Sequence, residues 1–217
     1  MRVLVGPLAE LRLGRLAAEV AERLAGPGGT VVSLRKAGVA DLSRRLSEAE
    51  IVLLREAVLG DQPEWSASTG RKGKGLAGYV CAGSRIADPD GMPAPGAAAV
   101  IAATDHADLT WRSPLTGPND DLMGPRFPGM NDVYAPEAVI ERLGEREDTP
   151  GERVLGEGMI VVPGIVAGVF DDGRLSDHEK EMVDILGCPG VSVELAPVAI
   201  VMAHLGLRVA AAVVMCP

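Results

Sequence analysis

Apolar and polar positions in the first third of the chain follow the periods of short strands and an amphipathic helix. The apolar run at 3–5 is typical of a buried strand, and Leu13, Leu16 and Val20 recur at helical spacing. Gly26 to Gly29 is a stop signal, which predicts one helix up to about Leu24. Further patterns predict strands at 30–34 and 51–54 with a short helix at 40–47. This β-α-β-α-β order favours parallel strands covered by helices.

The pattern breaks between 55 and 77, where glycine, proline and charged residues dominate. Beyond it, apolar runs predict strands at 78–82, 97–103, 159–162, 191–194 and 209–214. Helical spacing predicts helices at 136–147, 175–186 and 196–204. No internal repeat or second domain is visible. The sequence therefore predicts a single α/β domain over 1–217, with a mixed, mostly parallel sheet flanked by helices.

Ligands of such sheets bind beyond the carboxyl ends of the strands. Four predicted strand ends carry polar or glycine-rich residues, so we expect them to form one pocket. They are Cys81, Ala82, Gly83 and Ser84; Thr104 to His106; the segment 163–172; and Val193 with Glu194.

Composition excludes several classes of function. A net charge of −9 argues against a nucleic-acid partner, because phosphate backbones require clustered Lys and Arg. No run of 18 apolar residues is present, so we expect neither a signal peptide nor a membrane span. Three cysteines without metal-ligand spacing indicate a reduced, cytoplasmic setting and no metal site.

The segment from Asp105 to Tyr134 is long, irregular and rich in Asn, Asp, Gly and Pro. Such segments inside a compact domain are usually functional or disordered. Disordered segments have few aromatic residues, yet Trp111, Phe127 and Tyr134 are half of the chain's six aromatic residues. We therefore expect an ordered loop that builds a site.

This loop resembles that of the trimeric purine nucleoside and methylthioadenosine phosphorylases. The matching residues are Asp105-His106 with Leu109, Ser113-Pro114-Leu115 with Gly117-Pro118-Asn119-Asp120, and Gly124, Arg126-Phe127-Pro128, Met130, Asp132 and Tyr134. The resemblance covers roughly the second half of the chain. It implies a phosphorylase-like α/β fold, a homotrimer, a purine-type nucleoside as ligand and cleavage of its N-glycosidic bond by phosphate or by water. No cofactor is implied, apart from phosphate as a co-substrate.

Glu194 follows an apolar strand and precedes an apolar helix. A carboxylate at a helix N-terminus is favoured by the helix dipole alone, and this is one reading. In the wider superfamily a Met-Glu pair at this place holds the ribose, and Val193-Glu194 is similar to that pair. In the trimeric branch the position is a Ser that contacts phosphate.

Two aromatic residues have roles implied by the resemblance. Phe127 would cover the sugar of a neighbouring subunit, and its alternative is a loop anchor. Phe170 would stack on the base while Asp171 holds the purine, and the alternative is an exposed turn. His106, at a predicted strand end near the substrate, could transfer a proton or bind an anion, whereas the resemblance implies that it mainly supports the loop. Arg71, in a Gly-Arg-Lys-Gly stretch, is a weak candidate for phosphate binding, and a solvated loop is the competing reading.

Three departures from the family weaken the expectation of ordinary phosphorolysis. After the first strand the family has a Gly-Ser turn that binds phosphate, whereas this chain has Gly6-Pro7-Leu8-Ala9. Where the family has Asn-Ala-Ala-Gly, this chain has Cys81 to Ser84. The last strand runs into Met215-Cys216-Pro217 without the family's Asn or Asp that protonates the leaving purine.

Three hypotheses follow. The first is a nucleoside phosphorylase or nucleosidase that uses Glu194 and Asp171. The second is a non-catalytic nucleoside-binding homologue, or the partner subunit of a longer homologue. The third is unrelated chemistry on the same scaffold, because a fold does not fix a function. The sequence leaves open the preference for base and 5′ substituent, and the acceptor.

Overall fold

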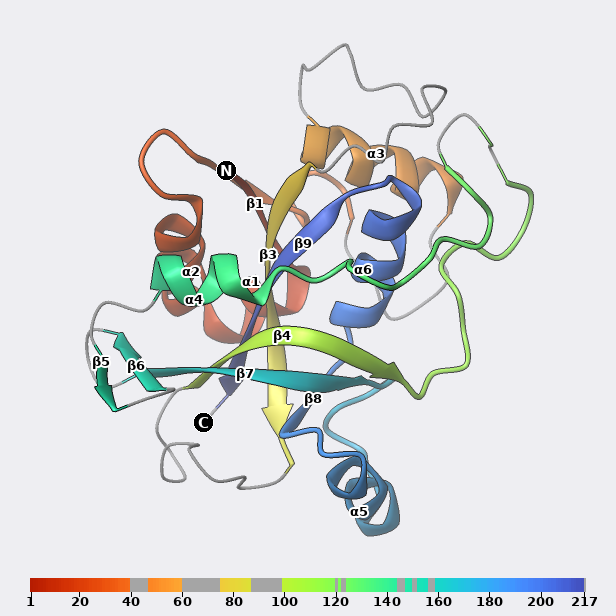
Figure 1. Ribbon diagram of the computed structural model, residues 1–217. Helices are drawn as coiled ribbons and strands as arrows, with labels where there is room; N and C mark the ends of the chain where they lie inside the picture. Colours follow the sequence, from red (N-terminus) through yellow and green to blue (C-terminus); the bar gives the residue numbers. More distant parts are fainter. Residues whose placement is uncertain are drawn as a thin grey trace.

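The computed structural model describes residues 1–39, 47–59, 75–86, 99–119, 121, 124–143, 147–149, 152–155 and 159–216. Within these residues, nine strands form one sheet in the order β2-β1-β3-β9-β4-β7-β6-β5, and β8 pairs with both β3 and β7 (Figure 1). The strands are β1 (Arg2–Val5), β2 (Thr30–Ser33), β3 (Leu76–Arg85), β4 (Ala99–Asp108), β5 (Glu147–Thr149), β6 (Glu152–Leu155), β7 (Met159–Gly168), β8 (Gly190–Ser192) and β9 (Arg208–Cys216).

The sheet is mixed and mostly parallel where it carries the core. β1 pairs parallel with β2 and β3, β3 pairs parallel with β9, and β4 pairs parallel with β7. The antiparallel pairing of β9 with β4 joins these two parallel groups. The predicted fold class is therefore confirmed.

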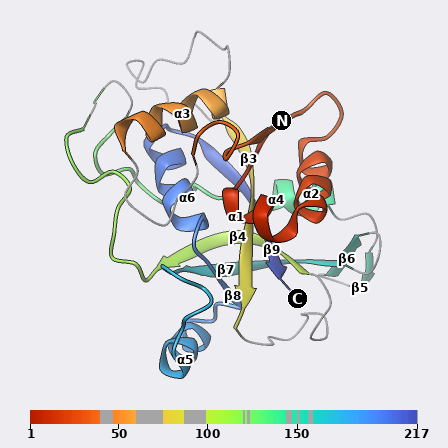
Figure 2. The ribbon, with the colours of Figure 1, turned by 180° about the vertical axis from the view of Figure 1, so that it is seen from behind.

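Helices cover both faces of the sheet, so its central strands are buried on both sides. On one face α1 (Pro7–Leu13), α2 (Arg15–Ala25) and α4 (Pro136–Leu143) pack on Val3, Val80 and Val214. On the other face α3 (Glu48–Leu59) and α6 (Leu195–His204) pack on Leu4, Ile101 and Val213. Figure 2 shows these two groups of helices on either side of the strands, and α5 (Asp177–Ile185) apart from both.

The strand predicted at 51–54 is wrong, because these residues lie inside helix α3. The missed signal is a capping box. The backbone N–H of Glu50 donates to Ser47 Oγ, and the Glu50 carboxylate accepts from the Ser47 backbone N–H at 2.9 Å. This reciprocal pair stabilises a helix start just before the apolar run. The helix predicted at 40–47 falls mostly on residues outside the described part.

The other elements agree with prediction except in their limits. The helix expected up to Leu24 is divided at Gly14, whose φ of +42° favours glycine. β4 continues beyond the predicted 103 through Asp105 and His106, after a register shift between Ala103 and Asp105. The short strands β5 and β6 have no clear sequence signal. None of the helices in the described residues has the length and hydrophobicity needed to cross a lipid bilayer.

Candidate functional site

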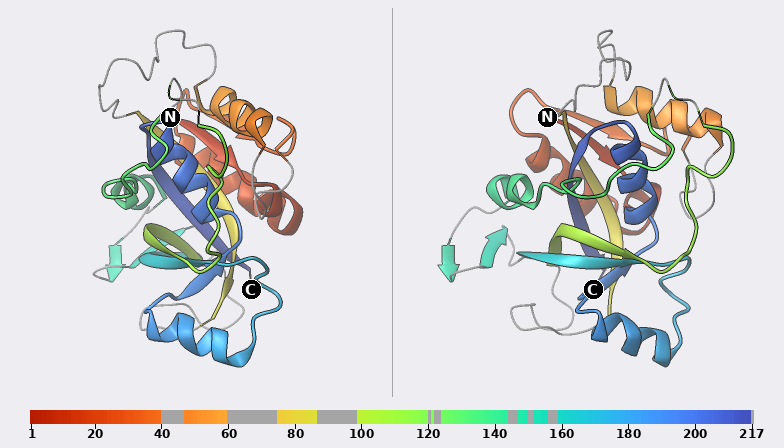
Figure 3. Two further views of the ribbon diagram at one scale, coloured as in Figure 1. Left: turned by 90° about the vertical axis from the view of Figure 1, so that its right-hand side faces the viewer. Right: turned by 45° about the vertical axis from the view of Figure 1, so that its right-hand side comes forward.

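The ends of β3, β7 and β8 meet, because β8 lies between the other two strands. Ser84 of β3 pairs with Val191, and Val166 of β7 pairs with Gly190. β4 runs beside β7 and ends next to Gly168. Figure 3 shows these strand ends close to the start of α6. The structure thus brings together the four segments that the sequence suggested would form one pocket.

Cys81, Ala82 and Gly83 support this junction from inside. Ser192 Oγ donates to the carbonyl of Ala82 at 2.8 Å and lies 3.7 Å from Cys81 Sγ. Burial, with the nearby Glu194 charge, raises the pKa of the Cys81 thiol well above its ordinary value, so the thiol stays neutral. A Cβ on Gly83 would lie 2.7 Å from Val213 Cγ1 and 2.9 Å from the Val191 carbonyl oxygen. These residues pack the strand ends closely.

Glu194 lies deep in the junction, at the N-cap position of α6, next to the buried Val193. Only 1% of its surface is exposed. Its Oε1 accepts a hydrogen bond of 2.7 Å from the backbone N–H of Leu8, the second residue of α1. Its Oε2 is buried and has no hydrogen-bond partner among the described residues. Burial raises the pKa of Glu194 to about 7, although the Leu8 hydrogen bond and the Arg12 charge act in the opposite direction.

Tyr79 and Gly6 complete the surroundings of the Glu194 carboxylate. The Tyr79 hydroxyl is buried and, like Oε2, has no hydrogen-bond partner in the described part of the chain. A Cβ on Gly6 would lie 2.4 Å from Glu194 Oε2 and 2.7 Å from the Tyr79 hydroxyl. Both polar atoms therefore face Gly6, and only glycine fits there without movement. Burial and the Glu194 charge raise the pKa of Tyr79 well above its ordinary value, so it remains a neutral phenol.

A second buried carboxylate, Asp172, lies at the end of the segment after β7. Arg12 of α1 forms a bidentate ion pair with it, of which the Nη2–Oδ1 distance is 2.9 Å. Ser84 Oγ donates to Asp172 Oδ2 at 2.8 Å. Burial acts to raise the pKa of Asp172, but the hydrogen bonds from Arg12 and Ser84 outweigh burial and lower that pKa. No pattern in the sequence distinguishes Asp172 from the adjacent Asp171.

Asp171, the residue suggested for holding a purine, lies on an exposed turn. Its carboxylate accepts from the Gly173 backbone N–H at 3.0 Å and lies 3.3 Å from Arg174. Phe170 is 43% exposed, and the Arg112 guanidinium lies 4.3 Å from the centre of its ring. The aromatic ring is thus partly exposed with Arg112 over it, while the inward-facing carboxylate of this turn is Asp172.

His106 joins the start of the long loop to its end. Its Nδ1 lies 2.8 Å from the Tyr134 hydroxyl, and its backbone N–H donates to Asp105 Oδ1. Burial lowers the pKa of His106, although the charges of Asp105 and Asp108 oppose this. A neutral imidazole bonded to Tyr134 suits a residue that supports the loop.

Phe127 lies far from Glu194 of the same chain. The loop before it is fixed to the carboxyl end of α6, where His204 Nδ1 lies 2.9 Å from the Pro125 carbonyl oxygen. Glu194 is at the opposite end of this ten-residue helix, about 15 Å away. Phe127 itself is 85% exposed.

Arg71, the weak phosphate candidate, lies outside the described residues. In the described part of the chain, no group of His, Cys, Asp and Glu side chains could hold a metal ion.

The second half of the chain is similar in sequence to known proteins. Residues 93–216, more than half of the chain, match the family model described as the phosphorylase superfamily. The chain is 31% identical to a purine nucleoside phosphorylase of Mus musculus over 113 residues, which are 51% of this chain and 37% of that protein. It is 28% identical to purine nucleoside phosphorylase 1 of Geobacillus stearothermophilus over 106 residues, 49% of this chain and 36% of that protein. The matched region thus spans little more than a third of these relatives.

The fold is also that of solved phosphorylases. Isoform 2 of purine nucleoside phosphorylase from Schistosoma mansoni, in complex with cytosine and ribose-1-phosphate, aligns with 99% of this chain and 75% of its own. The TM-score is 0.57 at 17% identity, which supports a shared fold. A Schistosoma purine nucleoside phosphorylase in complex with guanosine gives a TM-score of 0.52 at 17% identity over 87% of this chain and 60% of its own. On the match of residues 93–216, the chain belongs to the phosphorylase superfamily.

Proposed function

We propose that this protein binds a purine-type nucleoside beside the ends of β3, β7 and β8 and cleaves its N-glycosidic bond with water as the acceptor. Membership of the phosphorylase superfamily and the similarity to purine nucleoside phosphorylases support the nucleoside. The observation that carries the choice of water is the contact between Glu194 and the turn after β1.

The resemblance assigns phosphate binding to two positions, the turn after the first strand and the Ser that replaces Glu194 in the trimeric branch. Here these positions touch each other, because Glu194 Oε1 accepts the Leu8 N–H at 2.7 Å. A backbone N–H at such a turn binds anions well, and the protein's own carboxylate already fills that role. A phosphate placed there would compete with the Glu194 carboxylate for the Leu8 N–H, and it would be repelled by Glu194 whenever that group is ionised. Water carries no such penalty.

The two oxygens of Glu194 then have separate tasks. Oε1 fixes the turn, and Oε2 accepts a hydrogen bond from a ribose hydroxyl, a charge-assisted bond of the stronger kind. Since Oε2 is buried, the Gly6 turn and Tyr79 must move apart to admit the sugar. The sugar develops oxocarbenium character as the bond from C1′ to the base breaks, and the bonding electrons leave with the base. Water adds to C1′, and the proton that it loses is taken up by the departing base.

The remaining roles follow the resemblance. Phe170 stacks on the base. Asp171 gives up its ion pair with Arg174 and accepts hydrogen bonds from the N–H groups of the base. Phe127 covers the sugar of a neighbouring copy in a homotrimer. Its position at the far end of α6 supports contact with the site of another subunit rather than with Glu194 of its own chain.

A second candidate is a non-catalytic nucleoside-binding homologue or the partner subunit of a longer phosphorylase. The position of Asp171 favours it, because this carboxylate faces Arg174 at the surface and leaves no described acid in place to protonate the purine. General acid catalysis contributes about 10²–10⁴-fold, so a site without it would bind a nucleoside and turn it over little.

The test uses adenosine, guanosine, inosine and methylthioadenosine. Chromatography measures the release of base from each nucleoside, and calorimetry measures its binding. We expect release and binding of at least one nucleoside. Glu194→Gln should reduce base release at least tenfold, while Glu22→Gln on the exposed face of α2 should leave it unchanged. Binding without release supports the second candidate. No binding by any nucleoside contradicts both.

A further inference from the structure

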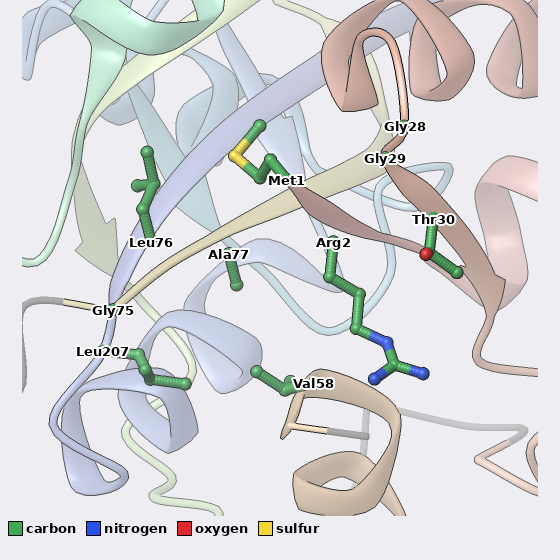
Figure 4. A pocket seen from close by; sticks show the side chains of 10 residues that line it. All are labelled: Met1, Arg2, Gly28, Gly29, Thr30, Val58, Gly75, Leu76, Ala77 and Leu207. Carbon is green, nitrogen blue, oxygen red and sulfur yellow. The ribbon is translucent and has the colours of Figure 1, made fainter. Parts of the chain in front are cut away.

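A cavity of about 410 Å³ lies at the amino ends of β1 and β3, the opposite end of these strands from Glu194 (Figure 4). Its residues come from β1, β3, the glycine turn before β2, α3 and the segment before β9. None of them belongs to the nucleoside site. The volume lies within the range of pockets that hold small molecules, about 300–1,000 Å³.

The wall combines apolar side chains with polar surface from Arg2, Thr30 and exposed backbone. Val58 of α3, Leu207 before β9 and Ala77 of β3 are buried side chains that line the cavity. Leu76 and Met1 add apolar surface at the rim, and the turn at Gly28 and Gly29 contributes bare backbone. The apolar side chains offer a surface for the hydrocarbon part of a ligand, and the polar surface offers hydrogen bonds to its polar part.

One cation lies beside these apolar side chains. The Arg2 side chain extends from β1 into the cavity, with its guanidinium beside Val58 (Figure 4). Its Nε is buried and has no hydrogen-bond partner among the described residues. The described acidic residues form no ion pair with it either. Arg2 as a whole is partly exposed, so its guanidinium can reach a ligand in the cavity, and its buried Nε is a donor that lacks an acceptor.

Thr30 supplies a second polar group. It is the register partner of Arg2 on the parallel strand β2, so their side chains project from the same face of the sheet. Both line the cavity. A guanidinium beside a hydroxyl can bind a carboxylate through several hydrogen bonds, and the planar fork of arginine matches a carboxylate in shape.

We propose that this cavity binds a small carboxylic acid with an apolar body. The carboxylate pairs with Arg2 and accepts from Thr30, and the hydrocarbon part lies against Val58, Leu76 and Leu207. Arg2 is the one Lys or Arg among the lining residues, which are all described, and it matches a single negative charge. Phosphate esters carry more charge and need more donors than this wall offers. In a chain of net charge −9, a local cation is also needed to hold any anion.

The test is calorimetric titration of the full chain with benzoate and hexanoate, compared with benzyl alcohol, hexanol and inorganic phosphate. We expect saturable binding of at least one carboxylate, and binding of its alcohol at least tenfold weaker. Arg2→Met should reduce carboxylate binding at least tenfold, whereas Arg15→Met on the exposed side of α2 should not. Leu76→Trp, at a partly exposed position, should weaken binding by filling the cavity.

The melting temperature of each variant shows whether it is folded. If Arg2→Met does not fold, the test rests on binding by Leu76→Trp and on the comparison of the carboxylates with the alcohols. The proposal is overturned if neither carboxylate saturates, if the alcohols bind equally well, if phosphate alone binds, or if folded Arg2→Met and Leu76→Trp bind like the unaltered chain.

Discussion

Glu194 Oε1 and the backbone N–H of Leu8 are joined by a hydrogen bond of 2.7 Å across 186 positions of sequence. This bond ties the first β-α turn, which matches the family poorly, to the part of the chain that matches the phosphorylase superfamily. It also occupies one oxygen of the carboxylate that the proposed reaction requires.

The stability of the protein should depend on the protonation of Glu194. Its pKa rises from 4.5 to about 7 on folding, so the fold prefers the protonated form. This contribution is complete below pH 4.5 and is lost as the pH rises through 7, by about 3 kcal/mol in all. Glu194→Gln resembles the protonated form at every pH. Urea unfolding at pH 4.5, 6 and 8 should show the variant gaining stability relative to the unaltered chain as the pH rises. A difference independent of pH would contradict a buried carboxylate whose pKa is raised by the fold.

Gly6→Ala should destabilise the protein by about 1–3 kcal/mol, the usual cost of forcing a methyl group into a packed site. The new Cβ would meet Glu194 Oε2 at 2.4 Å and the Tyr79 hydroxyl at 2.7 Å. Gly129→Ala is the matched control, because a Cβ there meets nothing within 4 Å. Thermal unfolding of both variants checks the expectation. Equal melting temperatures would mean that the Gly6 turn is loosely packed.

Asp172→Asn should cost about 1–3 kcal/mol at pH 7, less than the loss of a fully buried pair because Arg12 is 35% exposed. The lowered pKa of Asp172 means that its carboxylate stabilises the fold above its unfolded pKa and loses this effect as the pH falls. The difference from the unaltered chain should therefore shrink in acid. Asp171→Asn is the neighbouring control and should change stability by no more than about 1 kcal/mol, because its partner Arg174 is exposed. A larger effect at Asp171 than at Asp172 would reverse the assignment of the inward carboxylate.

Phe127 should act on the site of a neighbouring copy. Phe127→Ala and Glu194→Gln should each lose base release as separate oligomers. When the two variants are unfolded and refolded together, some sites combine an intact Phe127 with an intact Glu194 from different chains, and activity should partly return. Co-refolded variants that stay inactive while the unaltered chain refolds to full activity would place Phe127 outside the site.

Most strands were predictable because their apolar runs are short and bounded by turns, as at β1, β8 and β9. The run at 51–54 was assigned wrongly because a short apolar stretch does not distinguish a strand from a buried helix. The capping box of Ser47 and Glu50 decides between them, and it was legible in the sequence. Local chemistry outweighed the apolar run there.

The site shows where sequence reasoning stops. The place of Glu194 at a strand end followed from the pattern, but its burial depends on the Gly6 turn and Tyr79, which come from distant parts of the chain. Asp171 and Asp172 are adjacent and chemically equal. Which of them turns inward is decided by Arg12, 160 positions away, and by Ser84. No local pattern carries that information.

The most direct test of the central claim is the rate of base release from the best purine nucleoside, measured without phosphate and with increasing phosphate. With Glu194 in the anion position, we expect free ribose as the sugar product and a rate that phosphate does not raise. A rate that requires phosphate, with ribose 1-phosphate as the product, would contradict the claim.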